Sequence, residues 1–156
     1  MTDHDDRLAD LEARVHALEE RNSASPASDT SPGEAGTIGY QGAVDLCGDV
    51  AWTIRYDAAA TLDLAPGGIT TVLAALGNPV RLQIVRTLLR GPAAAAELQV
   101  SVGLSSAGQL YHHLKALTGA RIVEQESRNR YFIPAPKVVP LMIITLAGAD
   151  VSEQLG

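Results

Sequence analysis

The segment from Leu104 to Leu117 constrains the fold of this chain most strongly. Within it, leucines recur at the i, i+4 and i+7 spacing of one narrow apolar helix stripe, namely Leu110, Leu114 and Leu117. Upstream, residues 93–100 fit a shorter helix, and Gly103 lies between the two segments. This order predicts a helix-turn-helix.

The side of the 104–117 helix opposite the leucines is polar, because successive helical residues turn by about 100°. An exposed polar face after such a turn suits the DNA major groove, where base edges offer donors and acceptors. Gln109 can pair bidentately with adenine, and Lys115 can contact guanine or phosphate. A solvated amphipathic helix is the alternative. The predicted DNA contacts in this segment are Ser105, Ser106, Gln109, Tyr111, His112 and Lys115.

Charge is divided unevenly along the sequence. The net charge of the whole chain is −6, which by itself argues against a nucleic-acid binder. Residues 66–137, however, carry eight Lys and Arg against three Asp and Glu, a net charge of +5, whereas residues 1–65 carry four against thirteen, a net charge of −9. The predicted helix-turn-helix is therefore basic within an acidic protein, as contact with phosphates requires.

A hairpin is predicted directly after this helix. Residues 121–126 and 130–134 fit two strands around a short tip that carries two arginines and an asparagine. After a recognition helix, such a hairpin is the wing of a winged helix, and an ordinary solvated turn is the alternative. The wing would lay its tip on phosphates or in a minor groove through Arg128, Asn129 and Arg130.

Two further helices precede the helix-turn-helix. Residues 69–76 fit the first, and Asn78 followed by Pro79 is a strong start signal for the second. Gly91 and Pro92 end it. We therefore assign residues 65–134 to a winged helix-turn-helix DNA-binding domain.

The C-terminal segment 135–149 is predicted to be a dimerisation helix, with residues 150–156 as a tail. Residues 138–147 are apolar all round except for one threonine, and in so small a protein burial between two subunits explains this best. Pro140 is expected in the first turn of the helix. The predicted contacts between subunits in this helix and in the 69–76 helix are Val72, Leu76, Leu141, Ile144 and Leu146.

The first residues suggest a further dimer contact. Residues 1–22 fit a short coiled-coil helix, in which Arg and Glu at flanking positions favour a parallel pair, and a frayed acidic arm is the alternative. Residues 23–36 read as a flexible linker. The apolar seam of the coiled coil consists of Leu8, Leu11, Val15 and Leu18.

Residues 37–64 predict an N-terminal β-hairpin whose large apolar residues share one face. A lone hairpin is unstable in water, so that face should rest on the following domain or on a second subunit. Tyr40, Cys47 and Trp52 could line a pocket for a small-molecule effector, or they could simply pack. Cys47 is the only cysteine and cannot form an internal disulfide.

Several classes of protein are disfavoured. The sequence shows no secretory signal, and its longest apolar run, residues 138–149, is too short to cross a bilayer, so we expect a cytoplasmic protein without a membrane partner. It contains no Ser/His/Asp set, no phosphate-binding glycine loop and no pair of convergent carboxylates. We therefore expect neither an enzyme nor a cofactor.

The chain resembles the ArsR-type winged-helix transcriptional regulators. Residues 73–85 resemble the junction between that family's first two helices, and residues 112–117 resemble the end of its recognition helix. The resemblance implies a mainly α fold with a small β part and a homodimer formed by the outer helices. Metal sensors of the family carry cysteines at the positions of Ala94 and Ala96, so metal binding at those positions is excluded here.

The sequence thus predicts a homodimeric, sequence-specific regulator that binds double-stranded DNA, most simply as a repressor. Whether it also senses a small molecule stays open. The alternative is a winged-helix adapter that binds other proteins and has weak or no affinity for DNA. The acidic residues 1–65 would suit such an adapter.

Overall fold

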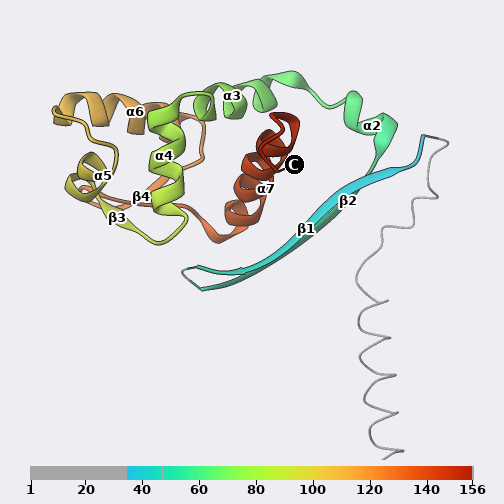
Figure 1. Cartoon of the computed structure of the whole chain (residues 1–156), viewed down its shortest axis with the longest axis horizontal. Helices are drawn as coiled ribbons and strands as arrows, with labels where there is room; N and C mark the ends of the chain where they lie inside the picture. The colour runs from blue at the N-terminus through green and yellow to red at the C-terminus, as the bar shows by residue number, and fades with distance from the viewer. Residues whose placement is uncertain (1–34, 47, 156) are drawn as a thin grey trace, which may run out of the picture.

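The structure, a computed structural model, describes residues 35–46 and 48–155. Figure 1 shows a body of helices with a small sheet, and a long β-hairpin that runs along one side of it. The winged helix-turn-helix fold predicted from the sequence is confirmed. Three sequence predictions lie outside the described residues, namely the coiled-coil seam of Leu8, Leu11, Val15 and Leu18, nearly all of the linker, and the pocket residue Cys47.

The hairpin consists of β1 (Thr37–Asp45) and β2 (Asp49–Asp57), which pair in antiparallel register from one end to the other. Residues directly opposite each other point to the same face of such a pair. One face is therefore entirely non-polar or aromatic, and the other carries the polar and charged residues. The apolar face consists of the pairs Ile38 with Tyr56, Tyr40 with Ile54, Gly42 with Trp52, and Val44 with Val50.

The strands end earlier than the predicted hairpin segment, which reached residue 64. A short helix, α2 (Ala58–Leu62), follows β2 directly. The carboxylate of Asp57 accepts a hydrogen bond from the backbone N–H of Ala60 at 2.8 Å, so it caps the first turn of α2.

The body is built from helices joined by short turns. The amide oxygen of Asn78 accepts hydrogen bonds from the N–H groups of Val80 and Arg81, which confirms the predicted helix start. The Arg81 side chain reaches back to carbonyl oxygens of Ala74 and Ala75 and so joins two helices at their junction. The helices are α3 (Pro66–Leu76), α4 (Pro79–Leu88), α5 (Ala95–Ser101), α6 (Ala107–Gly119) and α7 (Ala135–Val151).

The predicted leucine stripe of α6 is the centre of the core. Each of its three leucines is at most 2% exposed, and they meet equally buried side chains from α4 and α5. Burying a side chain of this size stabilises the fold by about 1.5–3 kcal/mol. The most deeply buried residues are Ile84, Val85, Leu88, Leu98, Leu110, Leu114, Leu117, Val123 and Val139.

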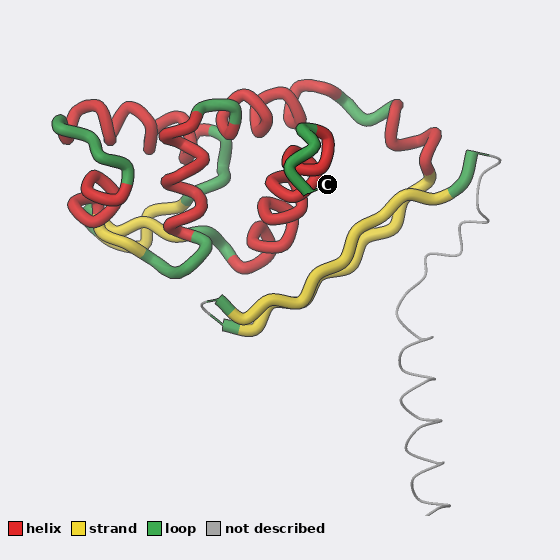
Figure 2. Tube along the Cα trace, viewed as in Figure 1, coloured by secondary structure: helices red, strands yellow, loops and turns green. Residues whose placement is uncertain are grey.

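The wing is a three-stranded sheet in the order β3–β5–β4, drawn in yellow at the edge of the body in Figure 2. It consists of β4 (Glu124–Ser127), β5 (Arg130–Phe132) and the two-residue β3 (Ala93–Ala94). The sequence pattern predicts a helix from Ala93 and gives no sign of β3. The residues of β3 instead pair with Tyr131 and Arg130 of β5, and α5 begins just after them.

α7 starts at Ala135, the first residue of the predicted 135–149 segment, and extends two residues beyond it to Val151. The prediction for Pro140 was wrong, since it lies inside the helix and Pro136 occupies the first turn. The Lys137 ammonium binds the carbonyl oxygen of Arg121 and, at 3.0 Å, the carboxylate of Glu124, so the start of α7 is tied to the base of the wing. No helix in the described ranges is long and apolar enough to cross a membrane.

Candidate nucleic-acid interface

The exposed face of α6 carries every side chain that the sequence analysis selected on this helix. Gly103 has a φ of +66°, a conformation that favours glycine, and it turns the chain between α5 and α6. Ser106 occupies the N-cap position, although its side chain makes no capping hydrogen bond. The six predicted DNA contacts in this segment are all exposed, namely Ser105, Ser106, Gln109, Tyr111, His112 and Lys115.

The two adjacent histidines of α6 lie in different surroundings. Their rings are edge to face with centroids 5.8 Å apart, and His112 is exposed whereas His113 is half-buried. The Nδ1 atom of His113 is buried and has no hydrogen-bond partner within the described part of the chain. Burial lowers the pKa of His113, and the positive charges of Arg81 and His112 lower this pKa further. His113 is therefore neutral at pH 7 and adds no charge to the exposed face.

The wing tip is attached to both helices of the helix-turn-helix through Asn129. The Tyr111 hydroxyl donates a hydrogen bond to the side-chain oxygen of Asn129 at 3.0 Å. The backbone carbonyl of Asn129 accepts from the N–H of Ala95, at the start of α5, at 2.8 Å. Asn129 has a φ of +64°, which asparagine tolerates better than most residues. The tip of the wing is therefore held beside the exposed face of α6.

The two arginines of the wing tip differ in what they contact. Arg130 forms an ion pair with Glu126 at 3.1 Å and donates a hydrogen bond to the carbonyl oxygen of Pro92 at 3.2 Å. It therefore braces the wing against the loop before β3. Arg128 makes no hydrogen bond or ion pair with any described residue, and it is exposed. Of the two predicted phosphate contacts, Arg128 is the cation left available for a ligand.

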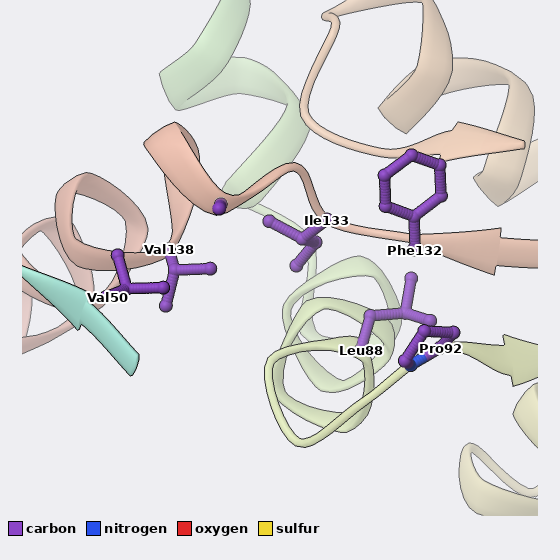
Figure 3. Close-up of a pocket in the computed structure, with 7 residues that line it drawn as sticks. Val50, Leu88, Pro92, Phe132, Ile133 and Val138 are labelled. Carbon is purple, nitrogen blue, oxygen red and sulfur yellow. The ribbon is translucent and has the colours of Figure 1, made fainter. Parts of the chain in front are cut away.

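The predicted pocket residues Tyr40 and Trp52 are not among the residues that line the cavity in Figure 3. The cavity in Figure 3 lies between β2, α7 and the wing, and its volume of about 180 Å³ is well below the ~300–1,000 Å³ of most small-molecule sites. The side chains of the residues that line it are all apolar, and these residues are Val50, Leu88, Pro92, Phe132, Ile133, Ala135 and Val138. No cluster of three or more metal-ligating side chains occurs in residues 35–46 and 48–155.

The predicted dimer contacts separate into two groups. Leu76 and Leu141 lie in the core of their own chain, at 8% and 4% exposure, so the prediction that they face a second subunit is not supported. Val72 and Ile144 are half-buried against that core, and Leu146 is exposed. Sequence reasoning missed Ile69 and Leu73, which are exposed on α3. Their i, i+4 spacing could have identified this second apolar stripe.

Comparisons with known proteins agree with this geometry. Residues 76–126 match the family model of a helix-turn-helix domain, which confirms the predicted motif. The strands that follow α6 make the domain a winged helix-turn-helix. No curated protein matches the chain.

Several solved structures are similar to the chain. One is the homodimeric winged helix-turn-helix DNA-binding domain of a possible ArsR-family transcriptional regulator from Mycobacterium bovis, with 28% identity over 63% of this chain and 89% of that one and a TM-score of 0.49. Another is NolR from Sinorhizobium fredii, with 23% identity over 62% and 93% and a TM-score of 0.47. A third is the transcriptional repressor BigR from Xylella fastidiosa, with 23% identity over 60% and 95% and a TM-score of 0.49.

Proposed function

We propose that this protein is a homodimeric transcriptional regulator that binds double-stranded DNA in a sequence-specific manner and acts as a repressor. One observation carries the proposal. The hydrogen bond between Tyr111 and Asn129 holds the wing tip, with its available Arg128, beside the polar face of α6. A helix for the major groove and a cation for the backbone thus lie on one surface.

The side chains of this surface divide into two roles. Gln109 and His112 project from α6 where base edges would lie, and they carry the specificity. Lys115 and Arg128 are cations without an ion pair in the described residues, and they neutralise phosphates. Arg130 acts indirectly, since it braces the wing that carries Arg128.

A second copy is needed for a specific site of useful affinity. A single winged helix of this size presents one recognition helix, whereas a twofold dimer presents two at about 34–36 Å, one turn of the duplex. The exposed apolar residues of α3 and α7 give that dimer a contact surface on elements other than α6. A dimer bound at a promoter excludes other proteins from it, and repression needs nothing more.

Selection of bound sequences from random DNA, followed by titration at several salt concentrations, tests the proposal. Lys115→Gln and Arg128→Gln should weaken binding to all sequences and lower the slope of log K against log salt by about 0.9 for each lost phosphate contact. Gln109→Ala and His112→Ala should change base preference, with a loss of about 1–3 kcal/mol on the preferred site. Arg55→Gln on the polar face of β2 removes the same charge far from α6 and should change neither property.

Some results would contradict the proposal. A full-length protein that binds DNA with no steep salt dependence, or does not bind, would favour the protein-binding adapter instead. Equal loss in the Arg55 and Arg128 variants would show that the position of the lost charge does not matter, and would contradict the assignment of Arg128 to a phosphate contact.

A further inference from the structure

The apolar face of the hairpin is covered over only part of its length. Near the turn, Val44 and Val50 pack against the core of the body. Gly42 faces α7 so closely that a Cβ atom there would lie 2.8 Å from Cγ1 of Val139. The hairpin is thus docked on α7 by the half of its apolar face that is nearer to the turn.

The other half of the same face extends past α7 toward α2, as Figure 1 shows. Its large side chains, together with Trp52 at the border with the docked half, are 36–54% exposed, and we call them the arm face: Ile38, Trp52, Ile54 and Tyr56. No charged residue lies on this face, because the register places the charged residues of both strands on the opposite face.

A two-stranded ribbon is marginally stable in water at best, and it needs a packed face to persist. Here the pairing continues in regular register to the outermost pair, Thr37 with Asp57, well beyond the docked half. The uncovered half of the apolar face therefore requires a partner surface. Because this half carries no charged residue, the partner surface must be apolar too.

Exposed apolar side chains also lie on two helices of the body. They belong to α3 and to the second half of α7, and we call them the helix face: Ile69, Leu73, Leu146 and Val151. In Figure 1, α7 lies between α3 and the hairpin. The hairpin therefore lies beside α7, one of the two helices that carry the helix face.

We propose that the arm face of each chain packs on the helix face of a second copy, in a reciprocal twofold exchange. Large side chains present roughly 150–250 Å² when fully exposed, so the partly exposed residues of the two faces offer on the order of 700 Å². This is close to the ~800 Å² that each partner contributes to a stable interface of standard size. Because the contact pairs two different faces, twofold symmetry forms it twice.

This inference rests on the proposed homodimer and specifies what holds it together. Trp52 is the only tryptophan of the chain and lies on the arm face, so its emission reports directly on the contact. With the full-length protein, we expect the emission maximum to move to shorter wavelength over the same concentration range in which analytical ultracentrifugation shows the mass doubling.

Matched variants locate the contact. Ile54→Lys places a charge on the arm face and should weaken dimerisation at least tenfold. Thr53→Lys places the same charge one residue away on the opposite face of β2 and should leave dimerisation unchanged. Leu146→Lys should weaken dimerisation as Ile54→Lys does, without altering the hairpin, and should keep the Trp52 emission at longer wavelength. This third variant keeps the test valid if Ile54→Lys unfolds the ribbon.

The outcomes separate this inference from the proposed function. A dimer that forms without a change in Trp52 emission, or that responds equally to Ile54→Lys and Thr53→Lys, overturns the reciprocal contact and leaves the homodimer standing. Emission at short wavelength at every concentration shows that the arm face is covered within one chain, and also overturns it. A shift of the Trp52 emission that appears only when lipid vesicles are added assigns the arm face to a membrane, and it overturns the reciprocal contact as well. A mass that stays monomeric at all concentrations contradicts the proposed homodimer itself.

Discussion

The helical body and the hairpin arm both have clear apolar patterns, yet they bury their apolar residues to very different extents. In the body, Ile84, Leu98 and Leu117 are fully buried, because stripes from α4, α5 and α6 converge on one another. In the arm, Ile38 and Tyr56 remain about half exposed, because only part of the ribbon has a helix against it. A local pattern therefore shows which face is apolar, whereas the arrangement of neighbouring elements decides whether that face is covered.

The largest expected effect comes from shortening one apolar side chain in the core and one in the arm. Leu117→Ala should lower the free energy of unfolding by about 2–5 kcal/mol, because it leaves a cavity where three helices meet. Ile38→Ala should cost far less in the monomer, since its side chain is already largely in water. Urea unfolding at low protein concentration measures both. Equal losses would mean that the arm is packed like the core.

The joint between the two regions provides the next test. Gly42→Val should destabilise the docked hairpin by about 1–3 kcal/mol, because its side chain would collide with Val139 of α7. Ala43→Val, on the exposed face of the same strand, should change stability by no more than about 0.5 kcal/mol. Thermal melts and hydrogen exchange of the β1 and β2 amides measure these effects. If both variants behave alike, close contact at residue 42 does not dock the arm.

Within the body, removing the single hydroxyl oxygen of Tyr111 should loosen the attachment of the wing tip. Tyr111→Phe removes the hydrogen bond to Asn129 and should cost about 0.5–1.5 kcal/mol. Hydrogen exchange should quicken in the wing, and affinity for selected DNA should fall as Arg128 loses its fixed position. The control is Tyr56→Phe, which removes a hydroxyl from the arm. Unchanged wing exchange in Tyr111→Phe would show that the wing is ordered without this bond.

The smallest expected effect is a dependence of body stability on pH. The pKa of His113 is lowered in the folded state, so the unfolded chain binds this proton more readily. The contribution of His113 is therefore constant above its unfolded pKa of about 6.5 and falls as the pH drops below that value. Urea titrations between pH 7.5 and 5 should show this loss in the parent protein and in His112→Gln, but less of it in His113→Gln. Identical pH profiles for all three would assign the dependence to other groups.

The features that sequence analysis recovered are those encoded over a few residues. The leucine stripe of α6, the Asn78 cap and Gly103 in the turn all depend on local spacing or on one backbone conformation. The exposed residues of the candidate interface were found in the same way, because a helix with one apolar stripe can only turn its other side outward.

Features set by distant partners could not be read in this way. β3 is two residues long and exists through its pairing with β5, so it has no periodicity of its own. The nearly all-apolar α7 has no polar face to fix its rotation, and Leu141 was therefore assigned to the wrong side. The engagement of Arg130 with Pro92 joins residues far apart in the sequence, and no local signal marks it.

The two-stranded construction of the hairpin also has a cost for solubility. Each of its strands has only one neighbour, so each keeps an open edge of backbone donors and acceptors that another chain could extend into a larger sheet. Asp45, Asp49 and Asp57 place negative charge at both ends of the ribbon and oppose such stacking. If this hairpin is the first place where the protein aggregates, neutralising these three aspartates should shorten the lag before fibrils appear.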